Sequence, residues 1–220
     1  MKLSRPLPLL LLFAAACGPI GAIAYKLQPD PTQEARYKLK DRPTAILVEN
    51  YENPDLAAND SELLTRDLYD RITKVEVDKK KLATFVPFQK VLDLRNSKPK
   101  DFPTMTMSQI GKAVGAEQII YVDLQNGGVA PLGTGAAMQG KAHAMVKVID
   151  VATGDTLWPT DMAEGFPVNA QTNPLAGQEV TSYNAVREQL YDTMGDQIAK
   201  LFYKYTIDRD GEPSKIQADQ

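Results

Sequence analysis

The chain reads EQIIYVDLQ from Glu117 to Gln125 and KAHAMVKVIDVATGDTLWP from Lys141 to Pro159. In both stretches apolar residues of the kind usually found in a core alternate with other residues, which is typical of β-strands that have two different faces. The second stretch contains ATGD, in which Gly154 suits a turn that needs a positive φ. The sequence therefore predicts a strand followed by a β-hairpin.

Helical patterns flank these strands. Upstream, Ser108 is placed to cap a short helix, SQIGKAVGA, which Gly115 would end. Before it, Asn59 and Glu62 have the spacing of a capping box at the start of a longer helix. A last helix is expected from about Ser182, because apolar residues recur there at helical spacing: Val186, Leu190, Met194, Ile198, Leu201, Phe202 and Tyr205.

Two further strands and two loops complete the pattern. TAILVEN at 44–50 is an aliphatic, β-branched run that indicates a buried strand. TFVPFQKVLDL at 84–94 indicates a second strand, with Pro87 favouring an edge position or a bulge. The glycine-rich residues 126–140 are expected to be a loop between strands, and residues 166–178, which contain prolines, a surface loop.

This order of elements, β-α-β-α-β-β-β-α, predicts an α/β (α+β) fold with a mixed sheet of about five strands flanked by helices. We expect one domain over residues 43–207, a size that suits a single hydrophobic core. The polar residues 208–220 are expected to form a disordered tail.

The N-terminal end carries a targeting signal. Residues 1–17, MKLSRPLPLLLLFAAAC, begin with basic residues and continue in an apolar run that ends in small residues and Cys17, the only cysteine of the chain. This pattern is typical of a bacterial lipoprotein signal and predicts lipidation at Cys17. Residues 18–42 are rich in proline and charge, which predicts a flexible tether.

Two other outcomes stay open at this end. Cleavage after Ala16 without lipidation would release a soluble protein, and an uncleaved helix from Leu7 to Tyr25 has about the length that spans a bilayer. Lipidation would hold the domain at the periplasmic face of the cell envelope. Gly18 after Cys17 favours the outer membrane over the inner one, because it is not the aspartate that retains some lipoproteins at the inner membrane.

Charge and residue types argue against several functions. The formal net charge is −3 and no basic tract longer than the three lysines at 79–81 is present, so nucleic acid is not an expected partner. The single histidine, His143, lies on the polar face of a predicted strand without a second histidine or a cysteine nearby, and we interpret it as a surface residue. We predict no catalytic residue, no metal site and no cofactor.

Acidic pairs and glycines are further candidates for chemistry. Asp67 with Asp70, or Glu49 with Glu52, could act as acid and base only if they met in a cleft. The sequence around Gly133 and Gly135 does not contain the lysine followed by serine or threonine that completes a phosphate-binding loop. Their uncharged loop is a candidate contact surface for a partner.

Trp158 is the third candidate contact residue. It stands at the end of a predicted strand beside a proline. It is expected either to pack on the sheet or to anchor a partner, with packing favoured.

The segment IGKAVGAEQIIYVDL, a glycine-bearing gap and then AMVKVIDVATGDTLW together resemble a family. They are similar to periplasmic lipoproteins related to the curli-secretion channel component and to the activator lipoprotein of penicillin-binding proteins, and to the amino-terminal domain of the Tol translocation protein B. The resemblance covers Thr44 to Tyr205. It implies a non-enzymatic, membrane-anchored domain that binds other envelope proteins, without catalytic residues to carry over. This chain departs from the secretion-channel member because it lacks a pair of long amphipathic hairpins, so a channel is not expected.

Three functions follow as hypotheses. The first is an envelope lipoprotein, anchored in the membrane, that binds envelope proteins in assembly, secretion or wall synthesis, either alone or as a homo-oligomer. The second is an exported protein that binds a small ligand or glycan, with Trp158 as a pocket wall. The third, an exported hydrolase, needs His143 within hydrogen-bond reach of a serine and an acid.

Overall fold

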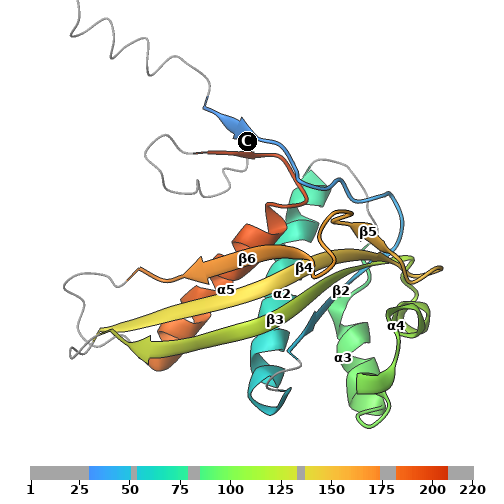
Figure 1. Cartoon of the computed structure of the whole chain (residues 1–220), viewed down its shortest axis with the longest axis horizontal. Helices are drawn as coiled ribbons and strands as arrows, with labels where there is room; N and C mark the ends of the chain where they lie inside the picture. Colours follow the sequence, from blue (N-terminus) through green and yellow to red (C-terminus); the bar gives the residue numbers. More distant parts are fainter. Residues whose placement is uncertain (1–29, 51–53, 79–84, 133–136, 174–181, 208–220) are drawn as a thin grey trace, which may run out of the picture. The chain divides into compact units, whose positions relative to one another are not determined.

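The computed structural model describes residues 30–50, 54–78, 85–132, 137–173 and 182–207. Over these residues the chain forms four α-helices, a five-stranded mixed sheet and a separate two-stranded sheet (Figure 1). It divides into two compact units. The smaller unit contains β1 (Thr32–Gln33) and β7 (Tyr205–Thr206), which pair antiparallel, and the larger unit runs from Glu34 to Lys204.

The large sheet confirms the predicted mixed topology. β2 (Thr44–Glu49) pairs parallel with β3 (Gln118–Pro131), and β3 pairs antiparallel with β4 (Met138–Asp150). The other edge of β4 is shared by two antiparallel strands, β5 (Thr156–Trp158) and β6 (Phe166–Gln171). The sheet order is therefore β2-β3-β4, with β5 and β6 both outside β4.

Two helices cover one face of this sheet. α2 (Pro54–Asp78) and α5 (Tyr183–Ala199) pack against each other, α2 against β2 and α5 against β4 and β6; in Figure 1 they lie behind the strands. Alternate strand residues are buried on this side, as expected for a face that supports a core. They include Ile120, Val122, Leu124, Ala144, Val146, Val148, Val168 and Ala170.

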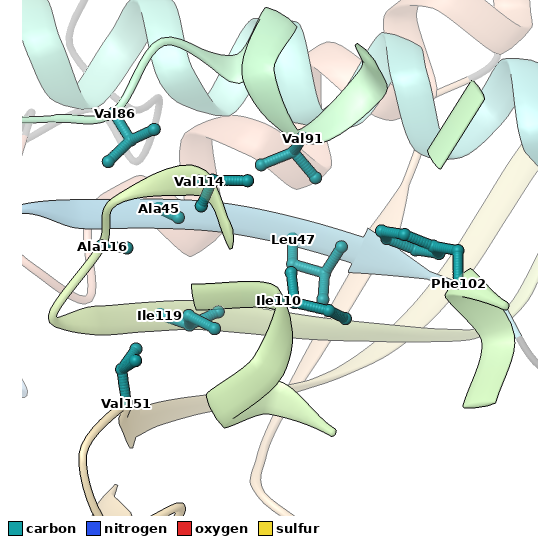
Figure 2. Packing of buried hydrophobic residues seen from close by; sticks show 10 residues of the cluster. All are labelled: Ala45, Leu47, Val86, Val91, Phe102, Ile110, Val114, Ala116, Ile119 and Val151. Atoms are coloured by element: carbon teal, nitrogen blue, oxygen red, sulfur yellow. The ribbon is translucent and has the colours of Figure 1, made fainter. Parts of the chain in front are cut away.

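The opposite face is covered only in part. α3 (Phe88–Ser97), the 3₁₀ turn η1 (Phe102–Thr104) and α4 (Met107–Val114) pack over β2 and the start of β3. Figure 2 shows the resulting cluster of ten buried side chains, with Leu47 and Ile119 between the strands and the helices. These helices bury β2 on its second face. The rest of this face of the sheet, formed by β3, β4 and β6, is not covered by any described helix.

Several predicted local signals are confirmed. The Ser182 hydroxyl caps α5 by accepting a hydrogen bond from the Ala185 amide, and Gly154 has φ +82° in the turn between β4 and β5. Gly115 ends α4 with φ +80°. The cap at the other end of α4 differs from the prediction, because Thr106, not Ser108, accepts the hydrogen bond from Gln109.

The strand predicted at 84–94 is wrong. Phe85 forms a single parallel bridge with Thr44, and α3 then begins at Phe88. Pro87 explains the change, because proline has no N–H for a strand ladder but is tolerated at the start of a helix. The capping box predicted at Asn59 is also wrong, because α2 begins at Pro54 and Asn59 lies within the helix. Proline is favoured at the first position of a helix.

Both predicted loops contain strands. Within 126–140, β3 continues to Pro131 and β4 begins at Met138, with a register shift near Asn126. Within 166–178, residues Phe166–Gln171 form β6, whose exposed and buried residues alternate. An edge strand forms ladder hydrogen bonds on one side only. Pro167, which has no N–H, is therefore compatible with this strand.

Part of the segment predicted as a tether packs on the larger unit. The Tyr37 amide donates to the Leu201 carbonyl over 3.0 Å, and Arg42 forms an ion pair of 2.9 Å with Asp150. Residues 34–42 therefore belong to the folded unit. The predicted signal with Cys17 and the tail at 208–220 lie outside the described residues.

Candidate binding surface

The uncovered face of β3, β4 and β6 carries polar side chains in cross-strand rows. Asn126, His143 and Asn169 stand opposite one another, and Lys141 stands opposite Gln171 in the next row. Residues that face each other across neighbouring strands have side chains close enough to interact. The His143 Nδ1 atom lies 2.7 Å from Asn169 Oδ1. Because an amide oxygen only accepts, Nδ1 carries the hydrogen in this contact.

These five side chains, with Ala142 and Ala170, line a shallow depression of about 260 Å³. The lining contains three amides, one imidazole and one ammonium group, and it contains no carboxylate. Amide and ammonium N–H groups can donate hydrogen bonds to a ligand. The depression therefore offers several hydrogen-bond donors at a surface that is otherwise largely apolar.

Sequence reasoning placed Lys141 and His143 on a strand but missed Asn126, Asn169 and Gln171. Because the sequence predicts loops at 126–140 and 166–178, it predicts no strand position for Asn126, Asn169 or Gln171. The signal was present in FPVNAQ, in which buried Val168 and Ala170 alternate with exposed residues.

The outer edge of β6 is a second feature of this part of the fold. Thr172 donates its amide to Gly140 on the β4 side, and Pro167 has no N–H. Because successive amides in a strand point to opposite sides, the amides of Asn169 and Gln171 face away from β4. Within the described residues no strand pairs with this edge.

Trp158 packs beside the start of that edge. Its ring is stacked on Phe166, the first residue of β6, with centroids 5.2 Å apart. Tyr37 lies 6.0 Å away and Phe202 6.2 Å away. Trp158 is half-buried, so it packs in the fold while part of its ring stays accessible. The candidates Gly133 and Gly135 lie outside the described residues.

Two of the four acidic residues considered for acid–base chemistry, Glu49 and Asp67, are bound by arginines. Glu49 accepts a hydrogen bond of 2.7 Å from Arg95, and burial raises the pKa of Glu49 against the opposing effect of that arginine. Asp67 accepts one of 2.8 Å from Arg71, and burial likewise raises the pKa of Asp67. Asp70 is exposed, and Glu52 lies outside the described residues.

The described residues that line the depression around His143 are amides, alanines and Lys141. Its side chain is hydrogen-bonded to Asn169, and neither a serine nor a carboxylate lines the depression around it. Among the described residues there is no group of three or more histidine, cysteine, aspartate and glutamate side chains positioned to hold a metal ion. In the same part of the chain, none of the helices combines the length and apolar character needed to cross a membrane.

Comparisons with known proteins give distant structural similarities. No family model matches the sequence, and no curated protein matches it. The chain is similar in structure to lipoprotein GNA1162 from Neisseria meningitidis, with a TM-score of 0.40 and 13% identity over 71% of this chain and 97% of that one. The predicted family resemblance therefore remains a prediction.

Two further structures show the same level of similarity. PelC from Paraburkholderia phytofirmans, solved as a dodecamer, has a TM-score of 0.40 and 10% identity over 80% of this chain and 99% of that one. The hypothetical protein CT253 from Chlamydia trachomatis has a TM-score of 0.38 and 12% identity over 73% and 96% of the two chains. These likenesses are remote, and no functional residue is carried over from them.

Proposed function

We propose that this chain is a membrane-anchored lipoprotein of the bacterial cell envelope whose domain binds another envelope protein and catalyses no reaction. The anchor is assigned to Cys17 from the signal that precedes it. The domain would act at the periplasmic face, with the outer membrane favoured, in envelope assembly, secretion or wall synthesis.

The observation that carries the partner-binding role is the outer edge of β6 beside Trp158. An exposed edge offers backbone donors and acceptors to an extended segment of a partner, which adds as another strand. Here the outward amides of Asn169 and Gln171 would pair with that segment. The half-buried Trp158–Phe166 stack, at the beginning of the same strand, would receive an apolar side chain.

The positions of the ionisable groups support a non-enzymatic role. Glu49, Asp67 and Asp150 each accept a hydrogen bond from an arginine, and His143 is hydrogen-bonded to an amide. A nucleophile activated by a base requires a different arrangement, with the two side chains in hydrogen-bond contact.

Cysteine-directed crosslinking in bacterial cells tests this role. Because Cys17 is the only natural cysteine and lipidation would block its thiol, Pro167→Cys places a single reactive thiol on the β6 edge. Lys74→Cys, at an exposed position of α2, is the matched control. We expect a crosslinked envelope protein from position 167 and none from position 74; identical products from both positions, or no product, would contradict the role.

Two further variants connect the crosslink to the edge. Gln171→Pro removes an outward amide without changing a buried side chain, and Trp158→Ala removes the aromatic anchor. Each is expected to lower the crosslink yield about ten-fold, the effect of losing a contact worth about 1.4 kcal/mol. A product with twice the mass of the chain would identify the partner as a second copy.

A second candidate function is favoured by the depression around His143. A binder of a small ligand or glycan needs a concave surface with directed polar groups. The depression supplies these groups, although Trp158 is not part of its lining.

A further inference from the structure

We propose that the depression formed by Asn126, Lys141, His143, Asn169 and Gln171 binds an anionic saccharide, with Lys141 contacting the acidic group and the amides contacting hydroxyls. This site and the partner-binding edge of β6 both include Asn169 and Gln171, but they use different atoms of these residues. The edge offers backbone amides, whereas the depression offers side chains on the face of the sheet.

The geometry gives the site several converging polar groups. Three neighbouring strands bring Asn126, His143 and Asn169 into one row, although 26 positions separate the last two in sequence. The hydrogen bond between His143 and Asn169 holds both side chains in place. With its oxygen occupied by His143 Nδ1, the Asn169 amide has its NH₂ group left to donate, and the neighbouring amides can both donate and accept.

The charge of the site selects the kind of ligand. Lys141 is exposed and has no ion-pair partner in the part of the chain that the structure describes. No carboxylate lines the depression, so a cationic ligand would meet an ammonium group without a compensating charge. A ligand with hydroxyls in addition to an anionic group would use the amide donors as well as the ammonium group.

The size of the depression limits the ligand. Its volume of about 260 Å³ is slightly below the roughly 300–1,000 Å³ of pockets for drug-sized ligands. A single sugar ring with one acidic group matches this size and offers hydroxyls to the amides. Because the depression is shallow, we expect weak binding, with a Kd on the order of 1 mM.

A titration of the ¹⁵N-labelled full chain in detergent, followed by NMR, tests the proposal. The probes are glucuronate and glucose 6-phosphate, with methyl glucoside as a neutral sugar and acetate as an anion without hydroxyls. We expect both anionic sugars to shift the amide signals of residues 126, 141, 143, 169 and 171, with a Kd three- to five-fold below those of the two controls. The tighter of the two anionic sugars identifies whether a carboxylate or a phosphate is preferred.

Variants make the result specific. Lys141→Ala should raise the Kd of both anionic sugars three- to five-fold and leave that of methyl glucoside unchanged, because only the charge interaction is lost. Lys74→Ala, on the helix side of the sheet, should change neither.

Three results would overturn the proposal: no saturable shift, shifts at other residues, or acetate binding as tightly as the anionic sugars. Because these measurements use the purified chain alone, their failure would leave the crosslinking test of the partner-binding edge unaffected.

Discussion

The hydroxyl group of Tyr191 on α5 donates a hydrogen bond of 2.9 Å to Asp60 Oδ2 on α2. Asp60 also pairs with Arg187, one turn before Tyr191 on α5. Burial raises the pKa of Tyr191, and Asp60 raises it further, so the hydroxyl keeps its proton and remains a donor. The same oxygen lies 2.6 Å from the place that a Cβ would take at Gly127 of β3. One side chain therefore joins both helices to the glycine-rich part of the β3–β4 hairpin.

Tyr191→Phe is predicted to lower the free energy of unfolding by about 1–2 kcal/mol, because it removes a hydrogen bond to a charged group without opening a cavity. Urea unfolding followed by the fluorescence of Trp158, the only tryptophan, measures the change. Tyr183→Phe is the control, since that residue of the same helix is 50% exposed. Equal losses in both variants would show that the Asp60 contact contributes nothing specific.

Gly127→Ala is predicted to destabilise the fold by about 1–3 kcal/mol, because the added methyl group would overlap the Tyr191 hydroxyl. The matched control is Gly128→Ala at the next residue, where a Cβ would meet nothing within 4 Å. The control should be neutral or slightly stabilising, since alanine loses less conformational entropy than glycine on folding. Thermal unfolding of both variants distinguishes crowding from a general effect of replacing glycine in this strand.

The double variant Gly127→Ala with Tyr191→Phe should be more stable than the sum of the two single effects predicts. Removing the hydroxyl takes away the atom nearest to the new methyl group, and the next atom of the ring lies 3.6 Å from it. A coupling free energy of at least about 0.5 kcal/mol in a double-mutant cycle is expected. Strict additivity would mean that the two residues do not meet as described.

Asp150 is predicted to contribute to the pH dependence of stability. The hydrogen bond from Arg42 holds the pKa of Asp150 below its ordinary value of 3.8, assisted by the amides of Ala152 and Thr153. A lowered pKa in the folded state stabilises the fold above the unfolded pKa, and this contribution is lost as the pH falls from about 4 through the folded value.

Asp150→Asn should therefore be less stable than the wild type at pH 7, by about 1 kcal/mol, and the difference should shrink below pH 4. Urea unfolding at a series of pH values measures it. Comparing the two proteins at each pH removes the contributions of other carboxylates such as Glu49 and Asp67. Asp155→Asn, at an exposed position of the same turn, is expected to behave like the wild type, and a constant difference for Asp150→Asn at all pH values would contradict the assignment.

Cys17→Ser is predicted to abolish membrane anchoring. The wild-type chain expressed in a bacterium should carry a diacylglycerol-sized mass addition and remain with the membranes, whereas the variant should lack both properties. Intact mass spectrometry and membrane fractionation measure the two effects together. If neither protein is modified and both are soluble, the lipoprotein assignment is wrong and the ligand-binding function becomes the leading one.

Local patterns in the sequence determined much of the fold. The strand at 118–125, the hairpin that turns at Gly154 and the helix capped by Ser182 were all predictable, because each depends on alternation or spacing among residues close in the chain. The same reasoning failed where tertiary packing chose the conformation. Residues 126–131 could have formed a loop, but α5 packs against them through Tyr191, and at Gly127 there is no side chain in the way.

The candidate binding surface was decided by tertiary structure alone. His143 was visible in the sequence as a polar strand residue, yet nothing local indicates that Asn126 and Asn169 lie on either side of it. Their meeting depends on the register of three strands, which is set by the buried residues Ala144 and Val168 on the other face and by the bulge near Asn126. Short-range patterns specify which segments can be strands and helices, because propensity and periodicity are local properties. Only the packed core decided which polar side chains share a surface, because burial of one face of a strand dictates what the other face presents.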